Sequence, residues 1–285
     1  MRGSEPSSAG STVTISFGAG APSVSVESVS RRYQQIRAGR TRRLFAVFGG
    51  IESDAGPIEE EDDDDDDDVL AESDDDLGER KPGDRELALA DVSLRLSGPG
   101  CVSFVGPANS GKSVLLRVMA GVTPPDSGRV VVTGLLAPVL ESLVNLLPRQ
   151  GRAERGVQVL AALTRLPVRD VRRRLPDIFG FLGEPQFAQS SLSSVSSRRR
   201  RELLFATMLS LDADIVLVDC PIPPGALGER CRERLLELKE RGALVVIAAA
   251  TGDDAGWIAD RVLYMRRGRV FRESGESSSG SAFSG

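Results

Sequence analysis

The chain has 285 residues, 40% of them apolar, which is long and apolar enough for one substantial hydrophobic core. It contains no histidine, so histidine-based catalytic triads, general bases and metal ligands are all excluded. The three cysteines are too widely spaced for a zinc site or a disulfide framework, and we expect Cys101 and Cys231 to lie in the core.

Negative charge is concentrated in one internal segment. The stretch from residue 51 to residue 79 holds 17 acidic residues and no Lys or Arg, whereas the rest of the chain carries 36 basic and 24 acidic residues. Its run EEEDDDDDDD, Glu59–Asp68, repels itself and has little apolar area to bury, so we expect a disordered insert over 51–84. A specific role as an internal polyanion is the alternative.

Both ends of the chain are rich in serine and glycine, and we expect residues 1–22 and 273–285 to be disordered. The N-terminus lacks the apolar block of a signal peptide, and the longest apolar run, Ala243–Ala250, is too short to cross a bilayer. These features predict a cytoplasmic, reduced protein with a single domain over 23–272.

Between the two ends, strand and helix patterns alternate. We expect strands at PSVSVESVSRRY, ELALADVSLRLSG and CVSFV, then a helix at KSVLLRVMAG and a strand at RVVVTG. Further along come the helix RELLFATMLSL, the strand IVLVD, a charged helix ended by Gly242, the strand ALVVIAAA and a closing hairpin at DRVLYMRRGRV. Strands that alternate with helices predict an α/β fold with a parallel sheet.

The stretch from Glu141 to Arg201 differs from the rest. Its apolar residues recur at helical spacing, strand signals disappear, and it holds 12 Arg, no Lys and 5 acidic residues. We therefore expect an inserted helical subdomain over 141–204. Nucleic-acid binding through these arginines is disfavoured, because aromatic residues make up only 5% of the chain and none is interleaved with the arginine clusters.

The segment GPANSGKS, residues 106–113, fits the phosphate-binding pattern G-x-x-x-x-G-K-[ST] and lies between an expected strand and an expected helix. Its glycines let the backbone wrap round a phosphate with N–H groups pointing inward, and the helix N-terminus adds positive potential. We expect Lys112 to reach the outer phosphates and the Ser113 hydroxyl to bind magnesium. The predicted nucleotide-binding residues are Gly106, Pro107, Ala108, Asn109, Ser110, Gly111, Lys112 and Ser113.

A second candidate magnesium ligand lies at the end of a buried strand. The apolar run IVLV leads into Asp219, which is followed by Cys220. In this α/β pattern we expect Asp219 to serve the magnesium ion. The simpler interpretation is a turn aspartate at the end of a core strand.

With these pieces in order, the chain resembles the ATP-binding-cassette (ABC) ATPase subunits, most of all those that power export of capsular polysaccharide, teichoic acid or O-antigen. The similarity runs from about Val24 to Arg272, interrupted by the acidic insert. The segments VESVSRRY, ALADVSLRL, GPANSGKS, PPDSGRVVVTG and DRVLYMRRGRV follow in the family's order and spacing. The resemblance implies a RecA-like P-loop core with an antiparallel β portion and an inserted helical subdomain, with ATP and Mg²⁺ as ligands.

The resemblance also suggests roles for individual residues. Tyr33 matches the aromatic residue that stacks on adenine. Glu141 lies near the position of a glutamine that senses the γ-phosphate, with Gln150 as a competitor. Ser196 and Ser197 match part of the family signature, which meets the nucleotide of a partner subunit.

Three positions depart from the family's pattern. In VSSRRRR the signature glycine is replaced by Arg198, and the glutamate that should follow Asp219 is Cys220. The switch histidine, expected near Ala250 or Thr251, is missing. Because a cysteine side chain is shorter than glutamate and its thiol is mostly protonated at neutral pH, no catalytic residue is intact, and we expect ATP–Mg binding with weak or no hydrolysis.

The four arginines Arg198–Arg201 pose a separate question. They follow Ser196 and Ser197, either of which is a natural helix N-cap. Cations at this end of a helix are unfavourable by about 0.3–1 kcal/mol for each nearby charge. Solvent exposure with salt screening is one explanation. The other is a nearby anion, either the γ-phosphate of a nucleotide on a partner subunit or the run Asp62–Asp68 of this chain.

The resemblance implies an ATP-binding subunit of a transporter, of the polysaccharide or polyol-phosphate export type. Its partners would be a membrane permease and a second ABC ATPase subunit, in a homodimer or a heterodimer at the inner face of the cell membrane. The alternative is a nucleotide-gated scaffold or regulator without a transport role, a pseudo-ATPase. Association with a permease distinguishes the two.

Overall fold

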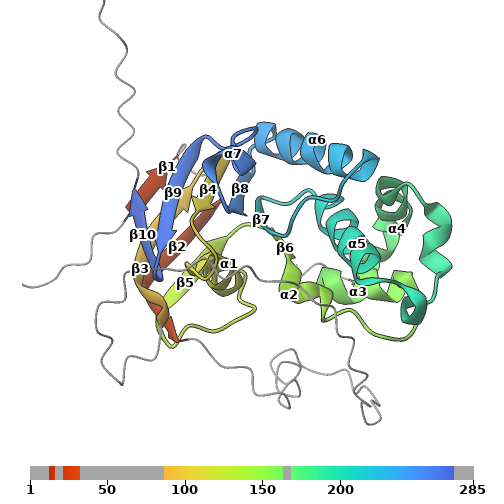
Figure 1. Ribbon diagram of the computed structural model, residues 1–285. Coiled ribbons are helices and arrows are strands. Elements are labelled where there is room, and N and C mark those ends of the chain that lie inside the picture. The colour runs from red at the N-terminus through yellow and green to blue at the C-terminus, as the bar shows by residue number, and fades with distance from the viewer. Residues whose placement is uncertain (1–12, 17–21, 33–86, 163–167, 273–285) are drawn as a thin grey trace, which may run out of the picture. The chain divides into compact units, whose positions relative to one another are not determined.

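The computed structural model describes residues 13–16, 22–32, 87–162 and 168–272. Tyr33, the segment 51–84 and the tail 273–285 lie outside these residues, so the predictions made for them are not tested. Within the described part, strands and helices alternate as the sequence predicts, and the strands form two sheets. The helices cover the larger sheet and extend beyond one of its edges (Figure 1).

The larger sheet has six strands in the order β10-β9-β4-β8-β7-β6, and all but β10 run parallel to their neighbours. The strands that the sequence indicates at CVSFV, IVLVD and ALVVIAAA are confirmed, as is the closing antiparallel hairpin β9–β10. The strand bounds are β4 (Gly100–Val105), β6 (Leu136–Leu140), β7 (Ile215–Asp219), β8 (Leu244–Ala249), β9 (Arg261–Arg266) and β10 (Arg269–Arg272).

Parallel pairing brings the carboxyl ends of these strands to one edge of the sheet. Leu140 at the end of β6 pairs with Asp219 at the end of β7, and Val105 at the end of β4 pairs with Ala249 at the end of β8. The loops that follow the four strands therefore emerge side by side, which is where ligands bind in open α/β sheets.

Strand β6 was not predicted from the sequence. Its segment LAPVL contains Pro138, and a proline within a strand pattern argues against an interior strand because it cannot donate a hydrogen bond to the ladder. In the described sheet β6 is the edge strand, with β7 as its one neighbour. Proline is tolerated in that position.

The smaller sheet has the order β1-β3-β2-β5, and its three longer strands are antiparallel. The fourth, β1, pairs in parallel with β3, so the prediction of disorder over 1–22 is wrong at residues 13–16. Three of these four residues are β-branched, the type favoured in strands. The bounds are β1 (Val13–Ser16), β2 (Ser23–Arg32), β3 (Leu87–Ser97) and β5 (Ser127–Thr133).

The helices fall into two groups. In one group each helix directly follows a strand of the larger sheet: α1 (Lys112–Met119) follows β4, α6 (Ala226–Glu240) follows β7 and α7 (Gly252–Ala255) follows β8. The other group lies together beyond β6, away from β10 (Figure 1), and contains the helices predicted between Glu141 and Arg201, the last of which continues to Leu209. It consists of α2 (Glu141–Val144), α3 (Ala153–Ala162), α4 (Val168–Leu182), α5 (Ser197–Leu209) and the short 3₁₀ turns η2 (Pro185–Gln189) and η3 (Leu192–Ser194).

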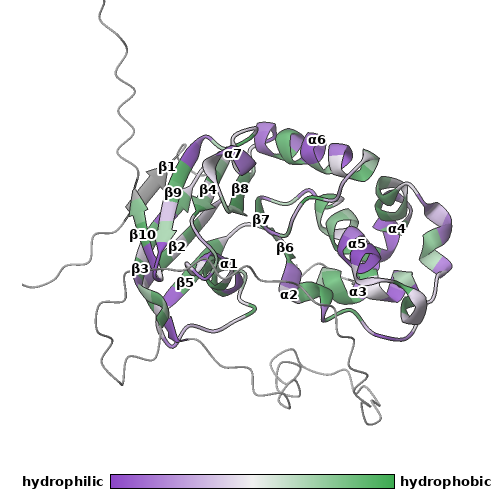
Figure 2. Ribbon diagram, in the orientation of Figure 1, coloured by the Kyte–Doolittle hydropathy of each residue, from purple (hydrophilic) through white to green (hydrophobic). Residues whose placement is uncertain are grey.

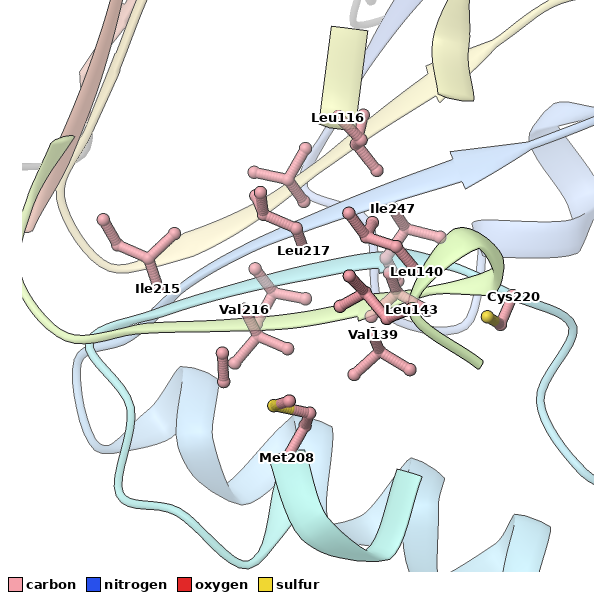
Figure 3. Packing of buried hydrophobic residues seen from close by; sticks show 14 of the residues in the cluster. Leu116, Val139, Leu140, Leu143, Met208, Ile215, Val216, Leu217, Cys220 and Ile247 are labelled. Atoms are coloured by element: carbon pink, nitrogen blue, oxygen red, sulfur yellow. The ribbon is translucent and has the colours of Figure 1, made fainter. Parts of the chain in front are cut away.

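Strands β4 and β8 of the larger sheet are buried along almost their whole length and are mostly apolar, as expected where both faces of a sheet are covered (Figure 2). Figure 3 shows the alternation: Leu217 of β7 points toward Leu116 of α1, whereas Val216 points to the other face, toward Met208 of α5. Helix α1 packs against the strand that ends at Asp219, and α5 packs against the neighbouring strand β6. All three cysteines are free and buried, which confirms the prediction for Cys101 and Cys231.

Candidate nucleotide-binding site

The segment 106–113 connects β4 to α1, in the strand–loop–helix context that its motif requires. Both of its glycines lie so close to the backbone of other segments that a larger residue would not fit. A Cβ at Gly106 would lie 2.2 Å from the Met265 carbonyl oxygen, and one at Gly111 would lie 2.4 Å from the Ala88 carbonyl oxygen. Gly111 also has a φ of +106°, a conformation that other residues rarely adopt.

The loop is supported by the turn of the closing hairpin. The Gly268 N–H donates to the Ser110 carbonyl oxygen at 3.0 Å, and the Ala90 N–H donates to the Gly268 carbonyl oxygen at 2.9 Å. The hairpin turn therefore links the start of β3 to the loop, and Met265 packs against it from β9. Sequence reasoning identified the hairpin but not this supporting role, because the contacts join segments far apart in the chain.

Lys112 folds back over the loop. Its Nζ donates to the carbonyl oxygens of Gly106 at 2.6 Å and Pro107 at 2.9 Å, and to Ser110 Oγ at 3.1 Å. Partial burial lowers the pKa of the Lys112 ammonium, although the nearby Asp219 carboxylate opposes that shift. An ammonium held by neutral acceptors in a partly buried place is well suited to an anionic partner such as a phosphate.

Ser113 and Asp219 meet at the mouth of the loop, as predicted. Ser113 Oγ donates to Asp219 Oδ1 at 2.9 Å. Burial raises the pKa of the Asp219 carboxyl, against the influence of Ser113, Arg117 and Lys112. A buried carboxylate that is destabilised in its charged form would gain from a cation.

The hydroxyl and carboxylate of Ser113 and Asp219 fit Mg²⁺, which prefers oxygen ligands and binds through few protein groups together with phosphate oxygens and water. The chemistry of this pair therefore suits a magnesium ion that arrives with a nucleotide.

Cys220, the residue after Asp219, is buried and cannot replace a carboxylate. Burial and the neighbouring Glu141 carboxylate both raise the pKa of the Cys220 thiol far above its ordinary value. The side chain is therefore a neutral thiol at physiological pH.

Glu141 begins α2, directly after β6, and lies beside Cys220. The guanidinium of Arg201 binds both of its oxygens, Nε to Oε2 and Nη2 to Oε1, each at 2.7 Å. This pairing holds the pKa of the Glu141 carboxyl below its usual value. The competing candidate, Gln150, lies in an exposed bend between α2 and α3, away from the strand end that carries Glu141. The structure thus brings Glu141, Cys220 and Arg201 together, a cluster that sequence reasoning did not find.

The other three arginines of the run also have partners within the chain. Arg198 pairs with Glu202 at 3.1 Å, and Arg199 pairs with Glu202 at 2.6 Å and with Glu184. The Arg200 guanidinium donates to three backbone carbonyl oxygens, those of Leu192, Val195 and Pro148.

Three of the four arginines, Arg198, Arg199 and Arg201, pair with carboxylates of the same chain, so these three charges do not require an outside anion. One of the partner carboxylates could have been predicted from the sequence. Glu202 lies four residues after Arg198 and three after Arg199, the spacings at which helical side chains meet. Arg198 keeps 66% of its side-chain surface exposed, whereas Glu202 keeps 7%.

Ser196 is the N-cap of α5 and accepts a hydrogen bond from the Arg199 N–H at 3.4 Å. One of the two predicted caps is thereby confirmed, and Ser197 is the first residue of the helix. Arg198 follows on the exposed side of the first turn. Their role as a signature that meets a partner's nucleotide stays a prediction.

The loop after β8, where a switch histidine was expected, carries no substitute for it. The Thr251 hydroxyl and its backbone N–H both donate to Asp254 Oδ2, each at 2.8 Å, and so form the cap of α7. Ala250 offers only a methyl group. The polar atoms of this loop are thus used locally.

The strand edge therefore carries a loop built for a phosphate, with a lysine and a magnesium-type pair of side chains. This arrangement defines a P-loop nucleotide-binding domain of α/β class. A family model described as ABC transporter matches residues 89–222, which include the loop, Glu141 and Asp219.

Similar proteins agree with that match. The chain is 27% identical over 192 residues to the teichoic acids export ATP-binding protein TagH of Listeria innocua, covering 67% of this chain and 56% of that protein. It is 27% identical to the O-antigen export system ATP-binding protein RfbB of Klebsiella pneumoniae, covering 68% and 79%. A taurine import ATP-binding protein, TauB of Roseobacter denitrificans, is 26% identical, with 67% and 75% covered.

Among solved structures, a bacterial ABC transporter cassette determined as a dimer superposes with a TM-score of 0.60 at 18% identity, covering 87% of this chain and 97% of that one. The match to the ABC transporter model covers residues 89–222, and the fold of the chain is that of the solved ABC ATPases, as the sequence predicted. It spans about half the length of the first teichoic acid export relatives that it matches. In the part of the chain that the structure describes, no helix is both long and apolar enough to cross a bilayer.

Proposed function

We propose that this chain is an ATP-binding subunit of an ABC transporter, which binds ATP with Mg²⁺ at residues 106–113 and Asp219. The observation that carries the proposal is the loop itself: its two closely packed glycines, its partly buried Lys112 and the Ser113–Asp219 pair. Backbone N–H groups at the start of α1 would bind the phosphates, and Lys112 would exchange its carbonyl partners for phosphate oxygens. Magnesium would supply positive charge that neutralises the outer phosphates.

The same site is poorly equipped for hydrolysis. An attacking water must be oriented in line with the γ-phosphate, and the transition state must be held by fixed donors. Cys220 is a buried neutral thiol, and the chain has no histidine for the loop after β8. Since one such donor contributes about 2.7–4 kcal/mol to the transition state, losing two groups leaves very slow turnover.

Transport of a polysaccharide or a polyol phosphate is the function that the export relatives support, at the inner face of the cell membrane and with a membrane permease. A pair of such subunits would form the working unit, as in the cassette solved as a dimer. Affinity capture from solubilised membranes tests the partner. Recovery of a permease supports transport, and ATP binding without any permease supports the nucleotide-gated regulator.

The binding proposal is tested by titrating the purified chain with ATP at fixed excess Mg²⁺, followed by calorimetry. We expect saturable binding that weakens about 10- to 150-fold in Lys112→Ala, because a charge-assisted contact is worth about 1.5–3 kcal/mol. The matched control is Arg173→Ala, which removes one positive charge from the exposed surface of α4. Lack of binding at millimolar ATP would overturn the proposal, as would equal losses in the two variants.

A further inference from the structure

The nucleotide edge of this chain does hold a carboxylate, but on the neighbouring strand. Leu140 pairs with Asp219 across β6 and β7, so the next residues, Glu141 and Cys220, emerge side by side. The two side chains are close enough to influence each other, since the Glu141 carboxylate helps to raise the pKa of the Cys220 thiol. The position after β7 thus lacks an acid, while the first residue after β6 is one.

The other acidic residues near this edge have partners or positions of their own. Asp219 is engaged by Ser113, and Asp254 is engaged by the cap of α7. Glu229, the next acid along the chain after Cys220, lies on α6. Glu141 remains about half exposed, which leaves room for a water molecule on its open side.

In the structure Glu141 is held by Arg201. The two hydrogen bonds of 2.7 Å fix the plane of the carboxylate and occupy both of its oxygens. Arg201 belongs to the first turn and a half of α5, the helix capped by Ser196. One residue on from Glu141, the Ser142 hydroxyl is buried and lacks a hydrogen-bond partner among the described residues, a sign that water or a ligand completes this place.

We propose that Glu141 is the carboxylate that orients the attacking water in this chain, and that Arg201 is a positioning residue that withholds it. The inference rests on the proposed function, since it requires ATP at the phosphate-binding loop. In the step, the water oxygen forms a bond to the γ-phosphorus while the bond from that phosphorus to the β–γ bridging oxygen breaks. ADP leaves with the electron pair of that bond, and Glu141 accepts the proton that the water loses.

Arg201 then accounts for slow turnover in a chain that still carries a suitable acid. A carboxylate bound at two points by a guanidinium is a weaker base and cannot turn toward the nucleotide. Turnover requires this ion pair to open, and because Arg201 lies on α5, the position of that helix controls the acid. Whatever moves the N-terminal turn of α5 would therefore change the rate of hydrolysis without touching the phosphate-binding loop.

The test compares Arg201→Gln, Arg201→Lys, Glu141→Gln and the double variant Arg201→Gln/Glu141→Gln, with Arg173→Gln as the charge control. Each protein is assayed for phosphate release across a range of ATP concentrations and for ATP–Mg affinity by calorimetry. Arg201→Gln should raise kcat at least about ten-fold with ATP affinity changed less than two-fold, because a positioned general base contributes about 10²–10⁴-fold. The double variant should lose that gain, and Arg201→Lys should keep most of the wild-type restraint.

The inference is overturned if Arg201→Gln binds ATP–Mg normally yet turns over no faster, or if its gain persists in the double variant. Failure of the wild-type chain to bind ATP–Mg would instead overturn the proposed function, and the inference with it. Thermal unfolding of each variant identifies loss of folding. Should Arg201→Gln unfold, Arg201→Lys is compared with the double variant Arg201→Lys/Glu141→Gln in its place. The expected gain in kcat for Arg201→Lys is then smaller, about two- to three-fold.

Discussion

The loop after β4 and the loops after β7 and β8 lie at the same edge of one sheet but differ in what they retain. The first has every group that a phosphate requires, held by close backbone contacts to Met265 and Ala88. The other two have Cys220 and Thr251 where water would be activated. On the function proposed above, binding and turnover would therefore depend on separate segments of this fold, so that one could be lost while the other persists.

The largest effect that we expect comes from a substitution in the phosphate-binding loop itself. In Gly111→Ala the new Cβ would lie 2.4 Å from the Ala88 carbonyl oxygen, in a backbone conformation that disfavours alanine. We expect a loss of about 2–4 kcal/mol in the free energy of unfolding and at least about ten-fold weaker ATP binding. Chemical denaturation and calorimetry measure the two quantities.

Gly121→Ala is the matched control for that substitution. Gly121 also has a positive φ, +72°, but a Cβ there would meet nothing within 4 Å. It should cost about 1 kcal/mol and leave ATP affinity unchanged. Equal effects at the two glycines would show that the close approach to β3 does not shape the loop.

We expect a smaller effect on stability from substitutions of the arginines at the start of α5. Arg199→Ala removes a guanidinium that pairs with both Glu202 and Glu184, and it leaves the buried Glu202 with Arg198 alone. We expect a loss of about 1–3 kcal/mol in the free energy of unfolding. Arg198→Ala removes a mostly exposed partner and should cost less than about 1 kcal/mol. If denaturation ranks the two variants the other way, the arginine run is not held by internal carboxylates.

The smallest effect is a pH dependence at Glu141. Arg201 lowers the pKa of this carboxyl in the folded state, so the pair stabilises the fold above the ordinary glutamate pKa of about 4.5. That contribution is lost as the pH falls through the lowered folded-state value. Because both side chains are partly exposed, Glu141→Gln should cost no more than about 1 kcal/mol at pH 7.

The check is denaturation of the wild type and Glu141→Gln between pH 3 and pH 7. The stability difference between the two proteins should shrink toward the acid end of that range. A difference that stays constant across it would mean that Glu141 is not charged in the fold or that Arg201 does not pair with it.

A feature of this structure could be predicted from the sequence when the residues that form it are close together in the chain. The phosphate-binding loop, the hairpin β9–β10 and the cap at Ser196 depend on residues that are adjacent in the chain, and all were predictable. The pairing of Glu141 with Arg201 depends on β6 lying beside β7 and on α5 packing over that edge. No local sequence pattern predicts such a contact. Pro138 also argued against a strand at β6, which is the strand that makes the contact possible.

The hairpin that supports the phosphate-binding loop has a consequence for biosynthesis. The N–H of Gly268 and the carbonyl of Met265 complete the surroundings of a loop whose own residues are made much earlier, at 106–113. On the ribosome, the strands of the smaller sheet are all made by Thr133, whereas the surroundings of the phosphate-binding loop are complete only after Gly268. ATP should stabilise only chains translated past residue 268, so ligand-assisted folding of this domain belongs to the last stage of synthesis.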